Sequence, residues 1–195
     1  MSKKRPYRLG KREASVNETK RRIIDAATLE YQENGIEKTS MQAVARRADV
    51  APGTVLYHYP TPEDLADAAI AEWTESLEMP GPDLIDATAP LDERVTALVS
   101  SVYEMYERSG WAYRIYQKSP NHPSLERGRQ MWEASLGAML GIVLGEQVAD
   151  PAVVQVVSVL IDPGFRGTLI SRGMSSEAAA DAAAKLTMSW LDADR

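Results

Sequence analysis

Apolar residues recur along this chain every three or four positions, and no stretch alternates convincingly with a period of two. One series, formed by Ile23, Ile24, Ala27 and Tyr31, ends before Gly35, and a second series follows Ser40. This spacing gathers apolar side chains on one face of an α-helix, whereas a half-buried strand needs strict alternation. The sequence therefore predicts an all-α protein.

Helix-start signals divide the N-terminal part into four helices. Asn17 and Ser40 are suitable N-caps for the first two helices, and Pro52 and Pro62 suit the first positions of the third and fourth. A proline-rich connector over 79–90 precedes the remaining predicted helices, which cover 91–108, 111–119, 124–146, 151–172 and 176–192. We expect Pro163-Gly164 to kink the fourth of these.

Charge is distributed unevenly between the two ends of the chain. Residues 1–60 carry 12 Lys/Arg and 7 Asp/Glu, a net of +5, although the whole chain has a net charge of −6. A basic N-terminal third on an acidic body indicates one polyanion-binding end; a basic tail before ordinary solvated helices would give the same numbers. There is no cysteine, signal-peptide pattern or membrane-spanning apolar run, so we expect a cytoplasmic protein without membrane association.

The segment 49–65, "DVAPGTVLYHYPTPEDL", suggests function because it places a tight turn and a short helix after two longer helical patterns. Three short helices with a turn between the second and third are typical of a helix-turn-helix, although any three-helix core has a similar pattern. In the third helix we expect Thr54, Tyr57 and His58 to face outward and Val55, Leu56 and Tyr59 to face inward. Gly53 has no side chain, which permits close approach to a base edge.

Residues 17–65, "NETKRRIIDAATLEYQENGIEKTSMQAVARRADVAPGTVLYHYPTPEDL", resemble the DNA-binding domain of the TetR family of transcriptional regulators. The resemblance covers a quarter of the chain, and the remainder is similar only in size and helix content. It implies a DNA-binding set comprising Thr39, Ser40, Gln42, Pro52, Gly53, Thr54, Tyr57 and His58. By the family pattern, Ser40, Thr54 and His58 would hold phosphates, whereas Gln42 and Tyr57 would reach bases.

The chain departs from the family pattern at two positions. Leu56 stands where Tyr is common, and Pro62 replaces a Lys that commonly contacts a phosphate. The basic arm over residues 1–16, which we expect to be disordered in isolation, could compensate by entering the adjacent minor groove, or it could be a solvated tail. The predicted organisation is this arm, a DNA-binding domain over 17–60 and a helical ligand-binding and dimerisation domain over 61–195.

Six of the twelve Tyr and Trp residues lie between Tyr103 and Trp132, and the chain has a single Phe. Amphipathic aromatic side chains around a cavity suit a largely apolar or aromatic ligand; a core with internally satisfied hydroxyls is the alternative. The predicted ligand-binding set comprises Trp73, Tyr103, Tyr106, Trp111, Tyr113, Tyr116, Met131 and Trp132.

Taken together, the resemblance implies a homodimeric repressor that binds a palindromic operator and is released by a small-molecule effector. The last two predicted helices would form the dimer interface, with Ala179, Ala183, Leu186 and Trp190 on one stripe. We expect no enzyme activity, cofactor or metal, because neither histidine belongs to a reactive or metal-ligating set. Two alternatives remain: a DNA-binding regulator controlled by a protein partner, and a helical enzyme of unidentified type.

Overall fold

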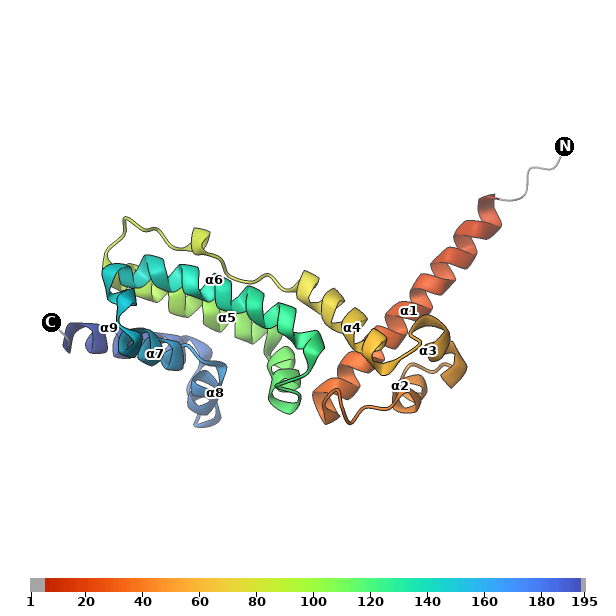
Figure 1. The fold of residues 1–195 in the computed structure, drawn as a ribbon. Helices are drawn as coiled ribbons and strands as arrows, with labels where there is room; N and C mark the ends of the chain where they lie inside the picture. The colour runs from red at the N-terminus through yellow and green to blue at the C-terminus, as the bar shows by residue number, and fades with distance from the viewer. Residues whose placement is uncertain (1–5, 194–195) are drawn as a thin grey trace. The chain divides into compact units, whose positions relative to one another are not determined.

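The computed structural model describes residues 6–193, and every regular element within that range is a helix (Figure 1). The all-α class predicted from the sequence is confirmed. No single helix of the described part combines the length and the apolar composition of a membrane span; the bent pair Pro151–Leu160 and Pro163–Ser171 passes that test by length and composition alone.

The chain forms two compact units, and the first comprises the chain up to Ser76 together with residues 114–126. Its helices are α1 (Pro6–Asn34), α2 (Met41–Arg47), α3 (Pro52–His58), α4 (Pro62–Ser76) and the short 3-10 helix η2 (Pro123–Leu125). The buried side chains that hold these helices together include Ile23, Ala27, Tyr31, Val44, Val55, Leu65 and Ile70. The predicted three-helix arrangement is therefore present, with α4 packed against α1.

Local signals set the boundaries of these helices. Gly35 ends α1 with a φ of +87°, a conformation in which a side chain would be strained. Ser40 begins α2 as predicted, and its hydroxyl oxygen accepts a hydrogen bond from the Ala43 N–H at 3.1 Å. Thr61 and Asp64 cap α4 reciprocally, because each side chain accepts from the other residue's backbone N–H at 3.0 Å.

The first helix begins earlier than the sequence predicts. Residues Pro6–Val16, which belong to the arm predicted to be disordered in isolation, are helical here and continuous with the rest of α1. Lys, Arg, Glu and Ala are good helix formers, and Pro6 occupies the first helical position, where its missing N–H does no harm. Extension of an existing helix is also easier than its nucleation at Asn17. The prediction for residues 1–5 lies outside the described residues.

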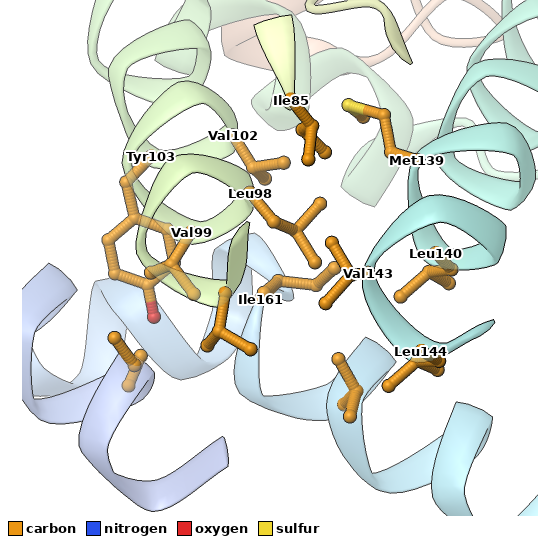
Figure 2. Close-up of a cluster of buried hydrophobic side chains, with 14 of the residues drawn as sticks. Ile85, Leu98, Val99, Val102, Tyr103, Met139, Leu140, Val143, Leu144 and Ile161 are labelled. Atoms are coloured by element: carbon orange, nitrogen blue, oxygen red, sulfur yellow. The ribbon is translucent and has the colours of Figure 1, made fainter. Parts of the chain in front are cut away.

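The second unit comprises residues 77–113 and 127–195. It contains η1 (Pro82–Leu84), α5 (Leu91–Lys118) as far as Tyr113, α6 (Glu126–Leu144), η3 (Gly145–Ala149), α7 (Pro151–Leu160), α8 (Pro163–Ser171) and α9 (Ser176–Ala193). Its core is an apolar cluster to which α5, α6, α7 and α9 all contribute; Figure 2 shows Leu98 and Val102 of α5 beside Met139 and Val143 of α6. Helix α9 packs on both α7 and α8.

Beyond residue 90, the structure differs from the predicted helix boundaries at two places. The predicted helices 91–108 and 111–119 are one helix, α5, with a kink at Ser109, where φ is −118° and ψ is 18°. The Ser109 hydroxyl donates to the Met105 carbonyl at 2.6 Å, and the Ser-Gly pair at this point is a common cause of such a kink. The predicted helix 151–172 is interrupted rather than kinked, because Asp162 caps a new helix that begins at Pro163.

The compact units do not follow the predicted domain boundaries. Helix α4 and residues 114–126 belong to the same unit as the helix-turn-helix. Helix α5 therefore begins in the second unit and ends in the first, and its kink at Ser109 lies within the part that belongs to the second unit.

Candidate functional sites

The turn between α2 and α3 is held by backbone and side-chain hydrogen bonds. Asp49 is the one described residue other than glycine with a positive φ, at 52°. The Val50 N–H donates to the Ala45 carbonyl at 3.0 Å. The Arg22 guanidinium of α1 donates to the carbonyl of Ala48 and, at 2.7 Å, to that of Asp49. Arg22 thus fixes the turn from which α3 starts.

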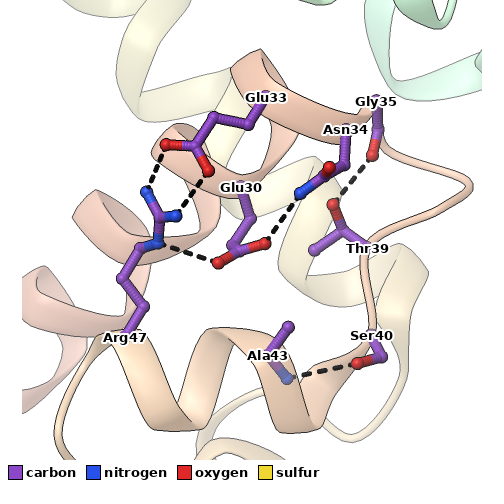
Figure 3. Close-up of polar contacts among 8 residues, drawn as sticks. All are labelled: Glu30, Glu33, Asn34, Gly35, Thr39, Ser40, Ala43 and Arg47. Carbon is purple, nitrogen blue, oxygen red and sulfur yellow. Dashed lines mark hydrogen bonds and ion pairs between the residues drawn. The ribbon is translucent and has the colours of Figure 1, made fainter.

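A second set of polar contacts joins α2 to α1, as Figure 3 shows. Arg47 donates to Glu33 and lies 2.8 Å from Glu30 through Nε. The Glu30 carboxylate also accepts from the Asn34 amide at 3.0 Å. The hydrogen bonds from Arg47 lower the pKa of Glu33 below its ordinary value. Arg47 therefore positions α2 against α1, and its guanidinium is already paired with two carboxylates of the protein.

Most of the predicted DNA-binding side chains lie at the surface. Ser40, Gln42, Pro52, Gly53 and Tyr57 are exposed, and Thr39, Thr54 and His58 are half-buried. Tyr57 is 80% exposed, more than any other large apolar side chain of the described part. A Cβ placed on Gly53 would meet no atom within 4 Å, so the start of α3 has an open side.

Two hydroxyls of the predicted phosphate-binding region already have structural roles. Thr39 donates to the Gly35 carbonyl at 2.8 Å, and the Ser40 oxygen accepts from Ala43. The Ser40 proton stays available, because a hydroxyl donates and accepts at once. Thr39 retains only acceptor capacity, which does not suit a phosphate oxygen.

Sequence reasoning missed two surface residues of the helix-turn-helix. Leu56 is 48% exposed, contrary to the inward orientation predicted for it, whereas Val55 is buried as expected. Arg46 is exposed in the last turn of α2 and, unlike Arg47, makes no ion pair with a described residue. Arg46 and Arg47 are adjacent in sequence, so only their contacts in the structure show that Arg47 is paired with Glu30 and Glu33 and that Arg46 is not.

The predicted ligand-binding residues are not one cluster, because they are divided between the two units. Trp73 and Tyr116 belong to the first unit, where their rings meet edge to face at 5.8 Å between centroids. Tyr106 and Trp132 form a similar pair at 6.1 Å in the second unit. Trp111 and Tyr113 are half-buried, and Met131 is 45% exposed on α6.

Tyr103 is buried beneath α7 and α8. Its hydroxyl donates to the Leu160 carbonyl at 2.8 Å, and the Arg166 guanidinium lies 5.8 Å from its ring centroid. Burial raises the pKa of Tyr103 to about 12, an effect that Arg166 partly opposes. Arg166 was not predicted, although a single arginine in the otherwise uncharged stretch 163–171 is a signal that could have identified it.

Residues 114–126 attach the end of α5 to the helix-turn-helix unit. The buried Ser119 hydroxyl accepts from the Ile36 N–H at 2.8 Å and donates to the Glu37 carboxylate. Lys118 donates to the Glu33 carbonyl at 2.8 Å. These contacts hold the joint between α1 and α2 on the segment that follows α5. Among the residues whose side chains are described, no group of three or more His, Asp or Glu is arranged to hold a metal ion.

Comparison with known proteins identifies relatives of both parts. Residues 23–69 match the family model described as bacterial regulatory proteins, tetR family. The HTH-type transcriptional regulator UidR of Escherichia coli K12 is 26% identical over 107 residues, 55% of each chain. The HTH-type transcriptional repressor KstR2 of Mycobacterium tuberculosis H37Rv is 24% identical over 52% of this chain and 51% of its own. The chain thus matches about half the length of these curated relatives.

A solved structure extends the similarity over more of the chain. The multidrug binding protein EbrR complexed with imidazole is 26% identical, covers 86% of this chain and 87% of its own, and superposes with a TM-score of 0.57. The same protein complexed with proflavin is 25% identical, covers 87% of this chain and 98% of its own, and has a TM-score of 0.55. The fold of both units is therefore similar to that of a ligand-binding relative.

Proposed function

Because the chain belongs to the TetR family of bacterial regulatory proteins, we propose that it is a transcriptional regulator that binds an operator on double-stranded DNA. The observation that supports this most directly is the exposed surface of α3 on a turn fixed by Arg22. Base edges are read by protruding side chains on a rigid support, and the 80% exposed Tyr57 fits that description. Repression is the direction we propose, as in the relative named a repressor.

Within this proposal the DNA-binding residues have separate roles. Gln42 and Tyr57 contact bases, and Ser40, Thr54 and His58 contact phosphates from half-buried or exposed positions. Pro52 and Gly53 let the start of α3 approach the groove. We assign no phosphate contact to Thr39, because its proton is already given to Gly35. Because operator DNA lies in the cytoplasm of a bacterial cell, we propose that the protein acts there.

The effector in this proposal is an aromatic or largely apolar small molecule. The similar protein EbrR is described as a multidrug binding protein and was solved with proflavin. In this chain the half-buried aromatic residues of the second unit, Tyr106, Trp111, Tyr113 and Trp132, offer the corresponding chemistry. Trp73 and Tyr116 are left out of this effector site, because they pack on each other in the first unit.

We further propose a homodimer with two-fold symmetry and a palindromic operator. Exposed apolar side chains on the last helices support it: Val159 is 60%, Leu186 49% and Trp190 38% exposed. Ala179 and Ala183, which the sequence placed on the same stripe, are fully buried within the chain and leave the interface to Leu186 and Trp190.

Effector control is tested by thermodynamic linkage. Operator affinity should fall when an aromatic compound binds, and operator DNA should weaken that compound's binding by the same factor. A coupling of about 1–3 kcal/mol corresponds to about 5–150-fold in either affinity. Fluorescence anisotropy of labelled operator, measured with and without aromatic compounds that do not intercalate into DNA, gives the operator affinity. Calorimetric titration of the same compounds into the protein, with and without operator, gives the compound affinity. A broad set of compounds that bind without changing operator affinity would instead support control by a protein partner.

A further inference from the structure

Arg166 is a largely buried cation among the aromatic residues of the second unit. It lies on α8, its side chain is 15% exposed, and its guanidinium carbon lies over the Tyr103 ring. A guanidinium has five N–H donors and cannot lose its charge. A buried guanidinium therefore needs hydrogen-bond acceptors nearby.

The acceptors of Arg166 are few. Nη2 donates to the Ser176 hydroxyl at 2.9 Å and lies 4.0 Å from Glu107, an ion pair at the limit of contact. The Nε–H is buried and meets no acceptor among the described residues. An unsatisfied buried donor of this kind costs about 1–3 kcal/mol, and more for a charged group. A partner outside the described residues, such as a water, an ion or a ligand, would satisfy this donor.

Two tyrosine hydroxyls near the start of α8 are also unpaired. Within the described residues, Tyr106 and Tyr113 make no hydrogen bond through their hydroxyls, whereas the Tyr103 hydroxyl donates to Leu160. The Tyr113 oxygen is 3.3 Å from the place where a Cβ on Gly164 would be. Burial first, and then the neighbours Asp162, Tyr113 and Tyr103, raise the pKa of Tyr106, so this hydroxyl keeps its proton and can donate it.

The carboxylates of this region are already engaged at the surface. Asp162 is exposed and accepts from the Gly164 N–H at 2.6 Å as the cap of α8. Glu107 is exposed and accepts from the Ser176 hydroxyl at 3.1 Å. Neither carboxylate accepts a proton from Arg166 Nε, Tyr106 or Tyr113. Each unpaired group of the site can therefore donate a hydrogen bond, and the Arg166 Nε–H can do nothing else.

We propose that Arg166, with the hydroxyls of Tyr106 and Tyr113, binds a carbonyl or carboxylate oxygen of an aromatic effector, whose ring packs beside Tyr106 and Trp132. The inference rests on the proposed effector control and specifies its ligand class. A cationic aromatic compound is disfavoured, because it would bring a second positive charge beside a buried guanidinium and leave the Nε–H unsatisfied. The proposed site thus requires a ligand that accepts hydrogen bonds, whereas a site that selects cationic dyes would not.

Three naphthalene probes test the ligand class: 2-naphthoate, the neutral 2-acetylnaphthalene, and the 2-naphthylmethylammonium cation. They share one ring system and differ in the polar group. Calorimetry on the full chain should give dissociation constants at least ~10-fold lower for the two acceptor probes than for the cation, since a hydrogen bond to a charged donor contributes about that much. Equal affinity for all three probes would overturn the proposal and leave effector control intact.

Variants of the full chain test the residue assignment. Arg166→Met keeps the length of the side chain and removes its donors, and it should abolish the preference for the acceptor probes. Arg172→Met is the matched control, because Arg172 is exposed at the end of the same helix. Tyr106→Phe removes one hydroxyl without changing ring packing and should reduce acceptor-probe affinity by ~2–10-fold, which keeps a test available if Arg166→Met folds poorly.

Unchanged affinity in both Arg166→Met and Tyr106→Phe would overturn the assignment of these residues. Absence of binding by all three probes would overturn the proposed ligand class. Operator binding by the unmodified chain, measured separately, then distinguishes this failure from a failure of the proposed regulatory function.

Discussion

At the scale of single residues, Arg22 supports the candidate DNA-binding surface from α1. It reaches from α1 to two consecutive carbonyls at the point where Asp49 adopts a positive φ. A non-glycine residue in that conformation is strained by of order 1 kcal/mol or more. The two hydrogen bonds offset this strain and determine the direction in which α3 leaves the turn.

Arg22→Met should therefore lower the free energy of unfolding by about 1–3 kcal/mol, the cost of leaving the partly buried Ala48 carbonyl without its charged donor. It should also weaken binding to all DNA sequences alike, because the whole of α3 is displaced. Urea denaturation and anisotropy titrations measure the two effects. Arg21→Met is the control for the lost charge, since Arg21 is exposed and makes no side-chain hydrogen bond or ion pair with the described residues. Identical behaviour of the two variants would refute the positioning role.

At the scale of elements, the end of α5 is a structural part of the helix-turn-helix unit. Ser119 is fully buried, and its hydroxyl joins Ile36 and Glu37 across 83 and 82 residues of sequence. The hydrogen bond from Ser119 is the main reason why the pKa of Glu37 lies below its ordinary value of 4.5.

Ser119→Ala should destabilise the protein at neutral pH by about 1–3 kcal/mol, because the Ile36 N–H loses its acceptor. A depressed carboxyl pKa adds stability above the unfolded-state pKa, and that stability is lost as pH falls through the folded-state pKa. The difference between wild type and variant should therefore narrow below pH 4.5. Urea denaturation across this range measures it, with Ser124→Ala as control in the same segment. A difference that does not change with pH would exclude the Glu37 contribution.

Element boundaries were predictable from sequence where the signal is local. Ser40, Pro52 and Pro62 act within one helical turn of themselves, and α2, α3 and α4 begin where these residues predict. The same reasoning placed a disruption at Pro163-Gly164, but it predicted a kink where the structure has a break between two helices. The N-terminal extension of α1 was missed because Pro6 and Gly10 were interpreted as breakers, although Pro is tolerated at a first helical position.

The candidate sites were harder to predict, because their composition depends on long-range contacts. Trp73 and Tyr116 pack on each other in one unit, whereas Tyr106 and Trp132 form a pair in the other. Proximity in sequence suggested a single aromatic cluster, and it could not reveal a division within α5. The role of Arg166 likewise follows from contacts with Tyr103 and Ser176, which sequence spacing does not specify.

At the scale of the whole molecule, self-association determines how the protein can meet a two-fold symmetric operator. Leu186→Glu should produce monomers, because it places a charge in each mate's interface at a cost of several kcal/mol. Lys185→Glu introduces the same side chain at an exposed position of α9, turned away from Leu186 and Trp190, and should remain dimeric. Sedimentation velocity distinguishes the two states. A dimer that survives Leu186→Glu would place the interface away from this face of α9.

The central claim, that α2 and α3 read a specific DNA sequence, is tested most directly by sequencing the genomic fragments that the purified protein retains. We expect an inverted repeat with half-sites about 34–36 Å apart or a multiple of that distance. Gln42→Ala and Tyr57→Ala should flatten the preference among sequences, whereas Thr54→Ala should lower retention of all fragments equally, because base contacts specify and phosphate contacts position. Retention without sequence preference, or a preference unchanged in Gln42→Ala and Tyr57→Ala, would contradict the account.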